Sequence, residues 1–156
     1  MRPSWDQHWM DMARLTSQMS TCASGRKVGA VFVRDKRLLA TGFNGVPSGY
    51  PHPVTCLRRE MNIPSGQQLD LCLCAHAEAN AITNAARYGM SLERATVYVT
   101  CQPCAGCMGA LANVGVLRVV FGGDYPDPRS QQIAHYAGME MIRMDENGEF
   151  VVIQPA

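Results

Sequence analysis

Hydrophobic and polar positions in the first third of the chain change from a helical to a strand periodicity. Residues 5–19 carry apolar side chains at helical spacing, and Ser4 followed by Gln7 three residues later is typical of a capping box. The β-branched run 28–33 and the apolar segment 38–43, separated by a charged turn, predict two adjacent strands. The chain therefore opens with a helix and a hairpin.

The second half of the chain alternates between the two periodicities. The pattern predicts helices over 76–87, 105–114 and 130–137, strands over 95–100, 117–121 and 139–144, and a weak strand over 150–153. Because each of the three main strands is joined to the next through a helix, we expect these strands to be parallel. The order predicts the α/β class, with helices on both faces of one sheet.

Residues 44–74 form a long segment rich in proline and glycine between these two halves. Loops of this length in a compact domain are usually functional or held by a cross-link. We expect residues 1–156 to form a single domain with a turn-rich, cysteine-bearing insertion at about 44–74.

Composition narrows the classes of function. The 156 residues are 47% hydrophobic and 17% charged with a formal net charge of +1, which is typical of a globular chain. Basic residues are scattered, so we expect no polynucleotide partner. The sequence shows no signal peptide and no apolar run long enough to span a bilayer, and we expect a cytoplasmic protein without a membrane partner.

Seven cysteines are many for a chain in a reducing compartment, where thiols more often bind metal than form disulfides. They are also clustered, with Cys72 close to Cys74 and with Cys101, Cys104 and Cys107 together. Clustering favours metal ligation over scattered core thiols.

The segments His76-Ala77-Glu78 and Pro103-Cys104-Ala105-Gly106-Cys107 carry the candidate chemistry. Cys104 and Cys107 begin one predicted helix, where a spacing of three places both sulfurs on one side and the helix dipole favours thiolates. His76 begins another helix and supplies a third ligand. Three protein ligands leave one tetrahedral position for water, which is typical of a catalytic zinc site.

Glu78 lies two residues after His76 and is a candidate general base. A carboxylate beside the metal can take a proton from water and deliver protons to a ring nitrogen and to departing ammonia. The alternative is a first-turn carboxylate that interacts only with the helix dipole. For His76, Cys104 and Cys107, the alternatives are ordinary core residues or ligands of a structural zinc site.

These motifs resemble the deoxycytidylate deaminases of the cytidine deaminase superfamily, from about residue 5 to residue 144. The resemblance includes the Gly-Phe-Asn-Gly-Val-Pro-Ser-Gly segment 42–49 and the Tyr-Val-Thr-Cys-Gln-Pro-Cys segment 98–104. It implies a three-layer α/β/α cytidine-deaminase-like fold with a central five-stranded mixed sheet. It also implies hydrolysis of dCMP to dUMP and ammonia, a homo-hexamer, and regulation by dCTP with Mg²⁺ and by dTTP.

The resemblance also implies substrate-binding residues. Asn44 matches an asparagine that contacts the sugar in relatives, although Asn-Gly is also a common turn, and Ala77 lies where the backbone can position the base. Arg26 and Tyr125 have groups suited to a 5′-phosphate, and a solvated surface position is the alternative for each.

Four further cysteines lie in or beside the insertion. Some relatives hold a second, structural zinc there, which predicts a site made by Cys22, Cys56, Cys72 and Cys74, with His52 as a substitute for Cys74. Buried apolar thiols are the alternative. We expect Cys101 to be a buried thiol or to lie behind the catalytic ligands.

Other functions remain open at this point. The zinc motif also occurs in tRNA adenosine deaminases and in guanine, riboflavin-pathway and free cytidine deaminases. A regulatory module held together by zinc, without enzymatic activity, is an alternative of a different class. The near-neutral charge argues against a tRNA substrate, and Glu78 beside an open metal position argues against the regulatory module.

Overall fold

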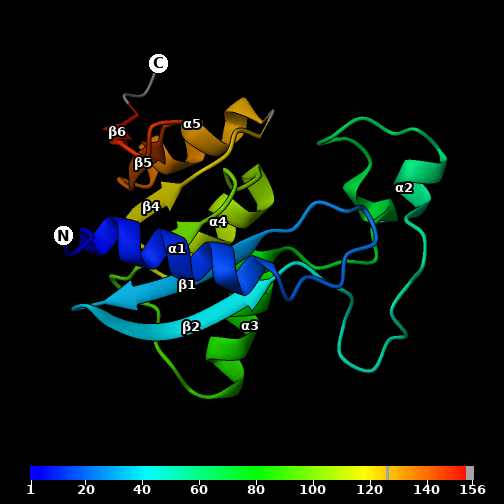
Figure 1. Ribbon diagram of the computed structural model, residues 1–156, viewed down its shortest axis with the longest axis horizontal. Coiled ribbons are helices and arrows are strands. Elements are labelled where there is room, and N and C mark those ends of the chain that lie inside the picture. Colours follow the sequence, from blue (N-terminus) through cyan, green and yellow to red (C-terminus); the bar gives the residue numbers. More distant parts are fainter. Residues whose placement is uncertain (126, 154–156) are drawn as a thin grey trace.

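The computed structural model describes residues 1–125 and 127–153, and its centre is one mixed sheet. The strand order is β2-β1-β3-β4-β5-β6 (Figure 1). The strands are β1 (Gly29–Arg34), β2 (Arg37–Phe43), β3 (Thr96–Val99), β4 (Arg118–Phe121), β5 (Glu140–Met144) and β6 (Phe150–Val152). The α-helices are α1 (Trp5–Ser17), α2 (Leu57–Glu60), α3 (Ala77–Arg87), α4 (Ala105–Asn113) and α5 (Pro128–Tyr136), with a 3-10 helix η1 (Leu69–Leu71).

The register of the sheet confirms the predicted parallel strands. β3, β4 and β5 are parallel, whereas β1 pairs antiparallel with both β2 and β3. The expectation of five strands is wrong, because β6 pairs antiparallel with β5 and adds a sixth. The tail after the last parallel strand turns back at residues 145–149, so that β6 pairs with β5 at the sheet edge while Phe150 packs against the core.

Helices cover both faces of the sheet, because each central strand is apolar on both sides. In β1, Ala30 and Phe32 pack in the core beneath α3 and α4, while Val31 and Val33 pack with α1. All four side chains are at most 5% exposed. The period of two along a strand thus supplies both cores of a three-layer fold.

Helix boundaries follow local capping. Ser4 begins α1 as predicted, since its hydroxyl accepts a hydrogen bond from the Gln7 amide at 3.1 Å. Helix α5 begins at Pro128 rather than at residue 130, because Asp127 caps it and proline suits the first helical position.

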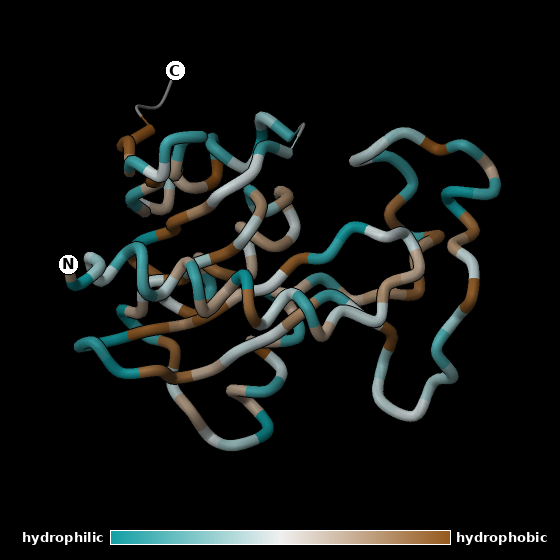
Figure 2. The backbone as a smooth tube through the Cα atoms, viewed as in Figure 1, coloured by the Kyte–Doolittle hydropathy of each residue, from teal (hydrophilic) through white to brown (hydrophobic). Residues whose placement is uncertain are grey.

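Residues 44–74 extend away from the sheet as a long loop that carries α2 and η1 (Figure 1). Figure 2 shows hydrophobic and hydrophilic residues alternating along this extended path, in contrast to the hydrophobic central strands. No residue of α2 or η1 is buried. The segment therefore gains little from apolar burial and depends on specific polar contacts and on its cysteines.

Among the described residues, no helix combines the length and the apolar character needed to cross a membrane.

Candidate metal centre and active site

Three donor atoms from two helix starts meet at one end of the sheet. His76 is the N-cap residue of α3, Cys104 is the N-cap residue of α4, and Cys107 lies in the first turn of α4. The Nδ1 of His76 lies 3.5 Å from Cys104 Sγ and 3.4 Å from Cys107 Sγ. All three donor atoms lie within 4.8 Å of one another.

Close packing of α3 on β2 places His76. Gly42 faces the backbone of Ala77 and Ala81 so closely that a Cβ at this position would overlap it. The side chains of Asn80 and Asn84 add hydrogen bonds from the helix to the backbone oxygens of β2, at 2.8 and 3.1 Å. The start of α3 is therefore fixed relative to the edge of the sheet.

The ionisation of the donor set suits a cation. The Cys107 thiol and then the His76 ring lower the pKa of Cys104 to about 4, against the effect of burial. The same interaction with Cys104, together with burial, raises the pKa of Cys107, and Cys104 raises the pKa of His76. One thiolate is thus stabilised by its neighbours alone, and a divalent cation would stabilise both sulfurs as thiolates.

Glu78 lies beside these donors and is only 4% exposed. Burial raises the pKa of its carboxyl group, while the nearby His76 ring opposes the increase. A raised pKa makes the carboxyl group a better proton acceptor, which is a property that a general acid–base requires.

The donor set fits zinc. One imidazole nitrogen and two thiol sulfurs are the ligand types that Zn²⁺ prefers, and three protein ligands are typical of catalytic sites. A cavity of about 100 Å³ lies against the same residues and is lined by His76, Glu78 and Cys104. The fourth side of the donor set therefore faces space that a substrate can enter.

The predicted substrate residues all line this cavity. Asn44, Ala77, Arg26 and Tyr125 contribute to its wall. The side chain of Asn44 is 7% exposed, accepts a hydrogen bond from the Val28 amide and donates one to the Arg26 carbonyl oxygen, both at 2.8 Å. These bonds hold the side chain in place at the cavity wall.

Arg26 and Tyr125 lie together in the cavity wall. The guanidinium carbon of Arg26 is 5.6 Å from the centre of the Tyr125 ring. The Tyr125 hydroxyl is buried and has no hydrogen-bond partner in the part of the chain that the structure describes. Cys101 is buried, as expected, and accepts a hydrogen bond from Arg26 Nη2 at 2.8 Å.

Several lining residues were not predicted from the sequence. Arg58, Ser65 and Gly66 come from the insertion, and Ser24 and Gln102 from segments beside the metal ligands. The proximity of Gln102 to Cys104 was a usable signal. No local pattern distinguishes Arg58 from Arg59, because only the path of the insertion decides which of them faces the cavity.

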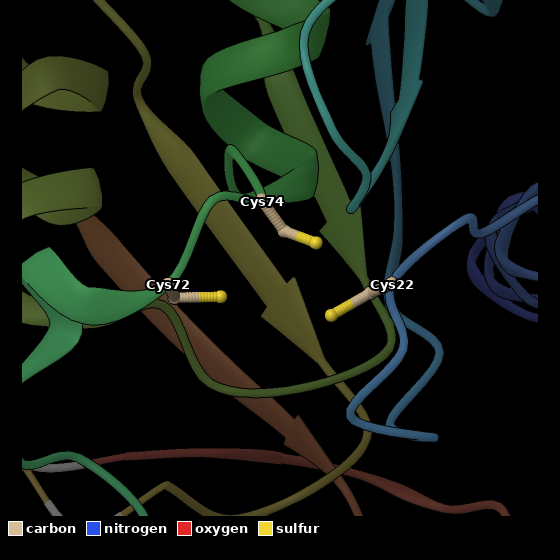
Figure 3. A group of neighbouring side chains, drawn as sticks. All are labelled: Cys22, Cys72 and Cys74. Carbon is tan, nitrogen blue, oxygen red and sulfur yellow. The ribbon is translucent and has the colours of Figure 1, made fainter. Parts of the chain in front are cut away.

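A second group of donors lies next to this cavity. Cys22, Cys72 and Cys74 have sulfurs within 4.8 Å of one another. Figure 3 shows the three side chains pointing toward a common centre, Cys22 from one side and the other two from the loop that precedes α3. Burial raises the pKa of the Cys72 and Cys74 thiols.

The remaining two candidate ligands are not part of this group of three. Cys56 lines a neighbouring cavity of about 310 Å³ together with Cys22, Cys72 and Cys74. His52 is exposed and does not line that cavity. Of the predicted ligands outside the group, Cys56 is therefore the better placed.

Comparison with known proteins identifies relatives of this architecture. A deoxycytidylate deaminase of Schizosaccharomyces pombe is 36% identical over 143 residues, which cover 90% of this chain and 44% of that protein. The chain thus spans less than half the length of this yeast relative. The deoxycytidylate deaminase of Mycobacterium phage D29 is 39% identical over 125 residues, covering 77% of this chain and 95% of that protein.

A solved structure and a family model agree with these relatives. The dCMP deaminase from the cyanophage S-TIM5, crystallised with dCMP and dUMP, matches with a TM-score of 0.75 and 30% identity, over 92% of this chain and 99% of that chain. The model of the cytidine and deoxycytidylate deaminase zinc-binding region matches residues 3–123, which include all three donors of the metal centre. The chain therefore belongs to the cytidine and deoxycytidylate deaminase family of zinc-binding proteins.

Proposed function

We propose that this chain hydrolyses dCMP to dUMP and ammonia, a reaction that supplies dUMP for thymidylate synthesis. The observation that carries the proposal is the buried carboxyl group of Glu78 beside the donors His76, Cys104 and Cys107, at a cavity that also reaches Arg26. The names of the relatives and the dCMP and dUMP bound in the cyanophage enzyme support the choice of substrate.

Different residues of the chain have different roles in the proposed reaction. When bound at the three donors, Zn²⁺ activates water for attack on C4 of the base. Glu78 takes a proton from the attacking water and delivers it to ring N3. It then takes the remaining proton from the new C4 hydroxyl and passes it to the amino group, which leaves as ammonia when the C4–N bond breaks. Asn44 and the backbone at Ala77 orient the nucleoside, and Arg26 and Tyr125 bind the 5′-phosphate.

A second zinc ion is part of the proposal, with a structural role. Cys22, Cys72 and Cys74 supply three ligands and Cys56 the fourth, which would close the coordination sphere. The convergence of three sulfurs on segments far apart in sequence supports this assignment. Such a site would tie the insertion to the end of α1 and to the start of α3.

The family resemblance extends the proposal to assembly and regulation. We propose a cytoplasmic homo-hexamer that is activated by dCTP with Mg²⁺ and inhibited by dTTP. Light scattering of the purified chain tests the assembly, and initial rates at sub-saturating dCMP with each effector test the regulation.

A side-by-side assay tests the function. The purified chain is loaded with zinc and supplied with dCMP, deoxycytidine, cytidine, guanine or tRNA, and the release of ammonia is measured. We expect kcat/KM for dCMP to exceed the values for all the others. Equal values for dCMP and deoxycytidine would indicate a nucleoside deaminase, and inosine formed in tRNA would indicate a tRNA enzyme.

A further inference from the structure

Arg58 comes from α2 in the insertion, yet it lines the same cavity as Glu78 and Arg26. We propose that Arg58 and Arg26 form a two-guanidinium clamp for the 5′-phosphate, so that the insertion determines the preference for nucleotide over nucleoside. This inference rests on the proposed function and extends it to a specificity-determining residue.

The hydrogen bonds of Arg58 leave part of its guanidinium free. Its Nε donates to the Gln67 carbonyl oxygen at 3.0 Å and its Nη2 donates to the Pro64 carbonyl oxygen at 2.8 Å. Its Nη1 has no acceptor within the described part of the chain. Arg58 thus orders the turn at 64–67 and still has donors for a ligand.

The same turn connects Arg58 with Arg26. Ser65 lies within the turn and accepts a hydrogen bond from Arg26 Nη1 at 3.3 Å. The other acceptors of Arg26 are Cys101 Sγ and the Asp124 carbonyl oxygen. Arg26 comes from the segment before β1 and Arg58 from the insertion, and both donate hydrogen bonds to the turn at 64–67.

Neither guanidinium has an acidic partner. Within residues 1–125 and 127–153, the ion pairs of the chain involve other arginines, and every acceptor of Arg26 and Arg58 is a neutral group. Two uncompensated positive charges at one cavity favour a dianionic ligand. A phosphate monoester has this charge, whereas a nucleoside does not.

The Tyr125 hydroxyl adds a third donor near both arginines. The hydroxyl is buried and has no hydrogen-bond partner among the described residues. A phosphate oxygen would accept its hydrogen bond. Burial raises the pKa of this hydroxyl, and the positive charges of Arg58 and Arg26 oppose the increase. Arg26, Arg58 and Tyr125 all line the same cavity, and Arg26 lies against the Tyr125 ring.

The test compares Arg58→Ala with Arg59→Ala. Arg59 carries the same charge one residue further along α2 but does not line the cavity. We expect Arg58→Ala to lower kcat/KM for dCMP about 10- to 100-fold, mainly through KM, and to change deoxycytidine turnover less than about twofold. Arg59→Ala should leave kcat/KM for dCMP and for deoxycytidine unchanged.

Zinc content and thermal melting of each variant verify its folding, and Arg58→Lys provides a second variant. Lysine keeps the charge but loses the fork that binds two carbonyl groups, so we expect it to recover part of the preference for dCMP. Suppose that the parent protein prefers dCMP. If Arg58→Ala then lowers kcat/KM for dCMP and for deoxycytidine equally, or changes neither value, the clamp is refuted and the proposed function stands. A parent without preference for dCMP would refute both.

Discussion

The carboxylate of Asp127 accepts a hydrogen bond at 2.8 Å from the backbone amide of Ala105, the residue directly after the metal ligand Cys104. The other carboxylate oxygen accepts from the Arg129 amide at 3.3 Å, in the first turn of α5. One side chain therefore caps two helices. Burial would raise the pKa of Asp127, but these amides and the Arg129 guanidinium outweigh it, so the pKa is lowered.

We expect Asp127→Ala to loosen the start of α4 and thereby the metal centre. Loss of a helix cap costs about 0.5–2 kcal/mol of the free energy of unfolding. A coloured chelator should remove zinc from the variant faster than from the parent. Asp127→Asn keeps an acceptor oxygen and should behave closer to the parent, and equal zinc release in all three proteins would contradict this role.

Glu78→Gln should abolish nearly all turnover of dCMP while keeping zinc and fold. An amide has almost the same shape as the carboxyl group but cannot exchange protons. Removal of a general acid–base typically costs about 10²–10⁴-fold in rate. Measurement of kcat together with zinc content by elemental analysis checks this, and a zinc-loaded variant that works like the parent would exclude Glu78 as the proton carrier.

Cys72→Ser should remove one of two zinc ions per chain. The substitution removes one of the three grouped sulfur ligands. The insertion then loses a cross-link that burial of its own apolar side chains cannot replace. We expect faster proteolysis within residues 44–74 and a lower melting temperature, with the catalytic zinc retained.

Cys56→Ser examines the fourth ligand of the same site. Because Cys56 lies outside the group of three, we expect weaker zinc binding rather than complete loss. A parent that contains one zinc per chain would contradict the second site, whichever variant is used.

Asp6 and Arg118 should make stability depend on pH. Arg118 donates to both Asp6 oxygens at 2.7 and 2.8 Å and Tyr98 donates at 2.6 Å, and these bonds lower the pKa of Asp6 against the effect of burial. Because the folded state holds this pKa below its ordinary value of 3.8, the stabilisation is complete above that value and is lost as pH falls through the lowered pKa.

We therefore expect Asp6→Asn to lower the free energy of unfolding by about 1.5–3 kcal/mol at pH 7, with the difference from the parent shrinking below pH 4. Urea denaturation at several pH values measures it. Asp11→Asn is the matched control, since its ion pair with Arg14 lies on the same helix at 2.7 Å but is about half exposed. Equal losses in both variants would contradict the prediction.

The sequence by itself determined the elements and the metal ligands. The periodicity of apolar residues that indicates a helix or a strand is a local property of the sequence. The spacing that places Cys104 and Cys107 at the start of one helix is local as well. His76 and Glu78 could be assigned for the same reason, since both lie at the start of one helix.

Only the tertiary structure decided which distant segments meet. The double cap by Asp127 and the approach of Arg58 to the cavity each join residues that lie far apart along the chain, whereas the pairing of β6 with β5 depends on the turn at residues 145–149. Local patterns carry no information on the path of a turn-rich segment, because many backbone routes satisfy the same proline and glycine positions. The fold selects one route through its packing and polar contacts.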